Sequence, residues 1–298
     1  MSLELLATPS GVPPRVRQIA SRRLVSPLLA DGASFDARFD WLRAEAATQA
    51  HEALDAAWPA AADEPPLHLV CTTILSKMVS GWRDHAHTLC ETLRQRTGLH
   101  PAGIIPGYQC AGWGFALRFA ARHTAHRRVL FSIVDADLHD LMSRGYEEVI
   151  GGIGFGVTTI AIELDAWPEL PQCDGPFANH GVTDLLHAVR DQHKRHGALP
   201  TFMPFVPDEL ATLSRRMIGD SMAPNRHDHY GHIFGSDPWI GVAEWLQRER
   251  PAETCDVLLG AFAYDGYTTV GRMRVGPFTH VDLRPDFRPA SPVAEVVT

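Results

Sequence analysis

The sequence lacks the paired cysteines, the positive charge and the long apolar runs that would assign it to several large classes of protein. Its five cysteines are scattered without a C-x-x-C pair, which argues against a disulfide framework and a cysteine-based zinc site. The formal net charge of −8 argues against a nucleic-acid partner. No apolar run is long enough to span a bilayer, and no basic segment precedes an apolar one near Met1. We therefore expect a cytoplasmic protein that binds neither nucleic acid nor membrane.

The composition is that of an ordinary globular protein. Hydrophobic residues make up 45% and charged residues 21% of the 298 positions, so the chain can bury a core without a metal or a disulfide. Helical and strand-like patterns alternate along it, which predicts an α/β fold. The patterns predict helices over residues 35–60, 83–96, 111–123, 184–196, 208–218 and 239–248, and strands over 67–73, 102–108, 129–134, 154–164, 200–205, 257–262 and 268–275.

The second half of the chain repeats the order of the first. The segment YQCAGWGFAL precedes VLFSIVD, and YGHIFGSDPW precedes VLLGAFA in the same way. We interpret this as two related halves, residues 1–165 and 166–298, although the copies share little identity. In this interpretation Cys110 and His232 occupy equivalent helix starts.

Cys110 is the candidate nucleophile, because it lies between a predicted strand and a predicted buried helix. Free N–H groups and the positive end of that helix favour a thiolate and can hold a developing oxyanion. Small residues, Ala111, Gly112 and Gly114, leave room for a substrate beside the sulfur. Free cysteines are otherwise commonly buried core residues, which is our interpretation of the other four.

His232 is the candidate general acid or base, since two related halves would bring its imidazole to the sulfur of Cys110. The alternative is that it has no role, because the chain has 16 histidines. Together with His227 and His229 it forms an H-D-H-x-x-H cluster that could ligate zinc. The spacing does not bring the three rings together on a helix or strand, so we predict no metal.

Several segments together resemble the ketoacyl-acyl carrier protein synthase III group of the thiolase superfamily. They are GYQCAGWGFALRFAARH, VLFSIVDADL, GFGVTTIAIEL, DHYGHIFGSDPW and LLGAFAYDGYTTVGRMRV, and the resemblance extends from about residue 35 to 276. It implies a five-layered α/β/α/β/α fold built from two pseudo-repeated halves, and a homodimer or a heterodimer with a related subunit. It also implies an acyl-cysteine on Cys110, formed from a coenzyme A or acyl carrier protein thioester with no further cofactor.

The resemblance assigns further residues and shows two departures. It places Gly266 in the loop that supplies the second oxyanion amide, beside the amide of Cys110. The family's Pro-His pair is Pro204-Phe205 here, and His232 stands where the family has an asparagine, as in the elongating ketosynthases. One catalytic histidine remains. Pocket positions are predicted for Thr72, Trp113 and Phe205, which lie at or beside strand ends or helix starts.

The missing histidine bears on the reaction. Decarboxylation of a malonyl thioester needs two donors for the enolate, whereas acyl transfer needs a nucleophile, an oxyanion hole and one base. We therefore expect an acyltransferase of fatty acid or polyketide-like metabolism. The alternatives are a decarboxylative ketosynthase and a catalytically silent subunit of a heterodimer. A cysteine α/β-hydrolase would need a glycine where Tyr108 stands.

Overall fold

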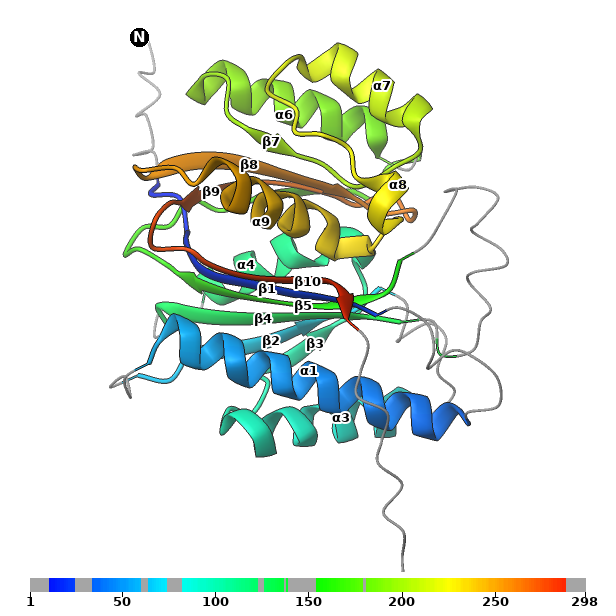
Figure 1. Ribbon diagram of the computed structural model, residues 1–298. Coiled ribbons are helices and arrows are strands. Elements are labelled where there is room, and N and C mark those ends of the chain that lie inside the picture. The colour runs from blue at the N-terminus through cyan, green and yellow to red at the C-terminus, as the bar shows by residue number, and fades with distance from the viewer. Residues whose placement is uncertain are drawn as a thin grey trace, which may run out of the picture.

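The computed structural model describes a layered α/β protein. The described residues are 11–24, 34–59, 64–73, 82–122, 126–136, 138, 154–178 and 181–287. Figure 1 shows five layers, in which two sheets alternate with three layers of helices. These layers confirm the predicted α/β/α/β/α architecture. Within the described ranges, no helix is long and apolar enough to cross a bilayer.

The first sheet is built mostly from the N-terminal half of the chain. Its strands follow the order β3-β2-β4-β5-β1, and β10 pairs with the free side of β1. Strands β4 and β5 are buried along nearly their whole length, as expected of strands covered by helices on both faces. The bounds are β1 Arg15–Leu24, β2 Leu67–Cys71, β3 Gly103–Ile105, β4 Arg128–Asp135, β5 Gly156–Glu163 and β10 His280–Phe287.

The ten described strands are hydrogen-bonded without a break, and those of the second layer, the second sheet, follow the order β6-β9-β8-β7. It meets the first sheet at one residue pair, Arg15 of β1 with Arg274 of β9. The C-terminal half predicted from the sequence thus contributes β10 to the first sheet, so the division at residue 165 does not separate the sheets. The bounds are β6 Gln172–Asp174, β7 Thr201–Phe202, β8 Cys255–Phe262 and β9 Thr268–Val275.

Two helices lie in the middle layer and position the site (Figure 1). They are α4 (Gly112–Arg122) and α9 (Asp237–Glu249). Trp113 of α4 packs edge-on against Trp239 of α9 with ring centroids 5.4 Å apart, in a core cluster that includes strands of both sheets. The outer layers are α1 (Phe35–Ala57) with α3 (Trp82–Thr97), and α6 (Val182–His196) with α7 (Asp208–Ile218).

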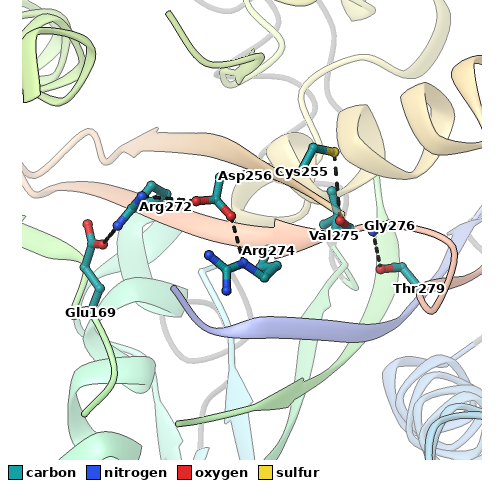
Figure 2. A network of polar contacts seen from close by, with 8 residues as sticks. All are labelled: Glu169, Cys255, Asp256, Arg272, Arg274, Val275, Gly276 and Thr279. Atoms are coloured by element: carbon teal, nitrogen blue, oxygen red, sulfur yellow. Dashed lines mark hydrogen bonds and ion pairs between the residues drawn. The ribbon is translucent and has the colours of Figure 1, made fainter. Parts of the chain in front are cut away.

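Ion pairs connect Glu169, which lies just before β6, with residues of β8 and β9 in the second sheet (Figure 2). Arg272 on β9 donates to Glu169 at 2.9 Å and to Asp256 on β8 at 3.1 Å. Asp256 also accepts from Arg274 at 3.0 Å. The alternation of a strand places Arg272 and Arg274 on one face, so a single carboxylate bridges both guanidinium groups.

The sequence patterns did not predict β1, β6 or β10. Arginines interrupt the apolar pattern of β1, and Arg22 among them is 2% exposed. Its guanidinium donates to Glu45 of α1 at 2.9 Å and also to Glu52. A buried charge is tolerated only with partners, and those partners are remote in the sequence. All the predicted helices and strands are present, with the strand at 102–108 shortened to β3 and that at 200–205 to β7. The predicted helix ends at 60 and 123 lie outside the described residues.

Candidate active site

Cys110 lies in η1 (Gln109–Ala111), a short turn that runs directly into α4. Its side chain is buried, at 5% exposure. The carbonyl of Ala111 accepts a 2.9 Å hydrogen bond from the hydroxyl of Thr269 on β9, which fixes the turn to the second sheet. The predicted position of Cys110 at a helix start is confirmed, and a helix N-terminus favours a thiolate close to it.

His232 lies between α8 (His227–Tyr230) and η2 (Phe234–Ser236), just before α9. Gly231 precedes it with a φ of +68°, a conformation that glycine adopts without strain. The Nε2 atom of His232 lies 3.6 Å from the Sγ atom of Cys110, within the range of a sulfur hydrogen bond. The two halves of the chain thus bring together the two residues predicted to act as nucleophile and base.

Asp237, which the sequence analysis did not single out, completes a triad. Its Oδ2 atom lies 2.6 Å from Nδ1 of His232, and the side chain is fully buried. Two backbone amides also donate to this carboxylate, Phe205 at 2.8 Å and Ile233 at 2.7 Å. Asp237 is the first residue of α9, where the helix dipole favours a negative charge. Burial raises the pKa of Asp237, while the charge and hydrogen bond of His232 and the two amides favour its ionised form. These contacts hold the carboxylate against His232.

The electrostatics of the triad make His232 a strong base. Burial disfavours the imidazolium, but the carboxylate of Asp237 and the sulfur of Cys110 outweigh it and raise the pKa of His232 well above its ordinary value. Because Nδ1 donates to Asp237, Nε2 is the nitrogen that faces the thiol with its lone pair. The arrangement can remove the proton from Cys110 and hold it on the imidazole.

The two predicted oxyanion donors, the amides of Cys110 and Gly266, differ in whether each already has a hydrogen-bond acceptor among the described residues. The N–H of Cys110 has no acceptor among the residues that the structure describes, and it lies at the start of the turn into α4. The N–H of Gly266 donates to the carbonyl of Ala263 at 2.8 Å within a tight turn. The amide of Gly266 thus has an acceptor within its own turn, and its role as an oxyanion donor stays a prediction.

The three predicted pocket residues are all buried. Thr72 donates its amide to Ile105 and lies at the end of β2. Trp113 packs in the core against Trp239, a contact that fits a structural role. The ring of Phe205 stacks on Tyr230 with centroids 5.8 Å apart. Contact with a substrate remains a prediction for Thr72 and Phe205.

The histidine cluster does not form a metal site in the part of the chain described. His227 and His229 lie on α8, while the ring of His232 is turned to Cys110 and Asp237. No group of three potential ligands gathers there or elsewhere among the described residues. The three histidines of the H-D-H-x-x-H motif thus have different surroundings.

The layered sheets and the two helix starts that meet at Cys110 and His232 define a thiolase-like fold. No protein-family model and no curated protein matches the chain. Solved structures with this fold do match. The 3-oxoacyl-(acyl carrier protein) synthase III of Pseudomonas aeruginosa PAO1 is 14% identical with a TM-score of 0.60, and the match covers 89% of this chain and 98% of that one.

Two further structures with the same fold carry other activities. ChlB3, described as an acyltransferase, is 13% identical with a TM-score of 0.63, and the match covers 89% of this chain and 98% of that one. AbyA1, a tetronic acid condensing enzyme, is 14% identical with a TM-score of 0.59, and the match covers 88% of this chain and 100% of that one. The chain therefore has the fold of ketoacyl synthase III-like proteins.

Proposed function

We propose that the protein is an acyltransferase that carries an acyl group as a thioester on Cys110. The observation that carries this proposal is the triad: Sγ of Cys110 lies 3.6 Å from Nε2 of His232, whose Nδ1 lies 2.6 Å from Asp237. A nucleophile, a base and a group that orients the base are the parts that covalent acyl transfer requires.

In the loading step, Nε2 of His232 takes the thiol proton while Sγ of Cys110 attacks the carbonyl carbon of an acyl thioester. The amide of Cys110 donates to the oxyanion of the tetrahedral intermediate. The carbon–sulfur bond to the donor then breaks, and the departing thiolate receives the proton from His232. The products are acyl-Cys110 and a free thiol, from coenzyme A or the phosphopantetheine of an acyl carrier protein.

In the transfer step, an alcohol, amine or thiol replaces the leaving thiol. His232 removes the proton of this acceptor as it attacks the acyl carbon, and it returns the proton to Cys110 when the thioester breaks. Throughout both steps Asp237 balances the positive charge that develops on the imidazole. No cofactor takes part in this scheme.

The surroundings of Phe205 favour transfer over decarboxylative condensation. Its ring stacks on Tyr230, and its backbone N–H donates to Asp237. The position that holds a second catalytic histidine in the family thus offers only an apolar ring. One imidazole can serve as a base, but a malonyl enolate would lack the second donor, which is worth roughly 3 kcal/mol in an oxyanion hole.

The similar structures support the proposal at a coarser level, since they include a ketosynthase, a condensing enzyme and an acyltransferase. By this likeness we propose acyl-coenzyme A or acyl carrier protein thioesters as donors, a cytoplasmic location, and a homodimer or a heterodimer with a related subunit. The silent-subunit alternative is less well supported, because an inactive chain would have no need of a buried carboxylate aimed at His232.

The experiment loads the purified protein with an isotope-labelled acyl thioester, removes the donor and adds candidate acceptors. Alcohols, amines and thiols are compared with a malonyl thioester. We expect the label to move to an alcohol, amine or thiol without release of CO₂. Release of CO₂ together with a β-keto product would instead establish the condensing reaction.

A further inference from the structure

The three residues that flank Cys110 are all held by one segment of the second half, residues 265–269. Tyr108 lies edge-on to Tyr267 with ring centroids 5.1 Å apart. The side-chain amide of Gln109 donates to the carboxylate of Asp265. The Ala111 carbonyl accepts from Thr269 at 2.9 Å. The turn that carries the nucleophile is therefore shaped by a loop and strand more than 150 positions away in the chain.

Gln109 is the unusual member of this set. Its φ is +46°, in the left-handed region that residues with a Cβ atom rarely adopt. Strained backbone of this kind persists only where the surroundings impose it, and it gathers at functional sites. The side chain of Gln109 is 6% exposed, so its amide needs a partner, and Asp265 supplies one.

The direction of the Cys110 side chain depends on this strained residue, because a change of φ at Gln109 rotates everything that follows it. A relaxed, negative φ would turn the Sγ atom of Cys110 away from its place 3.6 Å from His232. The mechanism above does not use Asp265, whose backbone belongs to the exposed turn between β8 and β9.

We propose that Asp265 is a positioning residue, which holds Gln109 in its left-handed conformation and so keeps Cys110 aimed at His232. The proposal rests on Cys110 as the nucleophile of the proposed function. Asp265 acts through a hydrogen bond to an amide, so an uncharged acceptor of the same shape should serve as well as a carboxylate.

The test measures alkylation of Cys110 by iodoacetamide, in which Sγ displaces iodide and no acyl donor is needed. Peptide mass spectrometry gives the rate at Cys110 and, in the same sample, at the half-buried Cys90 as an internal reference. We expect Asp265→Ala to slow Cys110 roughly 10- to 100-fold, the cost of a misplaced reacting atom. Asp265→Asn should retain the rate, and Asp220→Ala, a change at an exposed carboxylate, should leave it unchanged.

The same substitution in a Gln109→Gly protein distinguishes a positioning role of Asp265 from general damage to the fold. Glycine adopts a positive φ without strain, so Gln109→Gly should hold the turn without help from Asp265. We expect Asp265→Ala to have no further effect on the Cys110 rate in the Gln109→Gly background. Thermal unfolding of each variant shows whether the fold is intact.

An unchanged Cys110 rate in Asp265→Ala would overturn the proposal while leaving acyl transfer in place, and so would an equal slowing by Asp265→Ala in both backgrounds. A slow Asp265→Asn would also overturn it, since the hydrogen bond would then not be sufficient. If Cys110 of the unaltered protein reacted no faster than Cys90, the nucleophile itself would be refuted, and the proposed function with it.

Discussion

Replacement of Asp237 by asparagine should disable the triad while leaving its shape in place. Both carboxylate oxygens face N–H donors: Oδ1 accepts from Ile233, and Oδ2 accepts from Phe205 and His232. An asparagine must therefore set its own NH₂ group against at least one donor. If that group faces Nδ1 of His232, the imidazole takes the other tautomer and presents an N–H rather than a lone pair to Cys110.

The expected loss follows from that geometry. Without the carboxylate, the buried imidazole loses the charge that raises its pKa, and burial then disfavours its protonated form. We expect acyl loading on Cys110 to slow roughly 100- to 10,000-fold, which is about 3 to 5 kcal/mol of transition-state stabilisation at 1.36 kcal/mol per tenfold.

The assay is the rate of the acyl mass shift under single-turnover conditions, with NMR titration of His232 as a second readout. Asp228→Asn is the matched control, because it makes the same change at an exposed position on the neighbouring helix α8. Loading by Asp237→Asn at the rate of the unaltered protein would refute the reasoning, because the carboxylate would then contribute nothing to the base.

Two further predictions concern stability. Burial lowers the pKa of His68 from 6.5 to about 4. As the pH falls below 6.5, the unfolded chain therefore takes up the proton before the folded protein does, and the free energy of unfolding decreases. Between pH 6.5 and 4 the decrease is about 3 kcal/mol, at 1.36 kcal/mol per pH unit. In urea unfolding at pH 7 and pH 4, the free energy of unfolding of His68→Gln should fall by about 3 kcal/mol less than that of the unaltered protein. The same decrease in both proteins would contradict the role given to His68. A Cβ atom at Gly114 would overlap the side chain of Thr269, so Gly114→Ala should lower the free energy of unfolding by about 1 to 3 kcal/mol. Gly103→Ala, at a site with open space, is its control, and equal effects of the two would contradict the packing argument.

Much of the fold could be predicted because periodicity records which faces of a helix or strand are buried. Helix α7 and strand β9 have the predicted bounds. Strand β1 was not predicted, because Arg22 is buried against Glu45, a pairing that no local pattern shows. Strand β10 was not predicted, because it pairs with β1, which is far away in the sequence.

The site was predicted in part for a similar reason. Cys110 was identified because it lies between a predicted strand and a predicted buried helix, and His232 because it opens the equivalent turn in the second half. Asp237 was missed, although the sequence offers a signal: it opens a helix five positions after His232 and just before a proline. An acidic residue there usually serves only the helix end, and its contact with Nδ1 of His232 depends on how the intervening turn folds.

For Gly266, the sequence predicts the place of the residue but not the direction of its backbone N–H. The resemblance placed Gly266 in a loop, and it lies in the turn between β8 and β9 with a φ of +83°. The direction of its N–H depends on the turn type, and here the amide donates to Ala263 within the loop. A residue's place in a loop can thus be inferred from the sequence more readily than the direction of its backbone donor.

The most direct test of the central claim is intact-protein mass spectrometry after incubation with a panel of acyl-coenzyme A and acyl carrier protein thioesters. The account predicts an added acyl mass that maps to the Cys110 peptide and is lost in Cys110→Ala, while Cys255→Ala, a change at another free cysteine, retains it. An adduct that persists in folded Cys110→Ala, or no adduct with any donor on the unaltered protein, would contradict the claim.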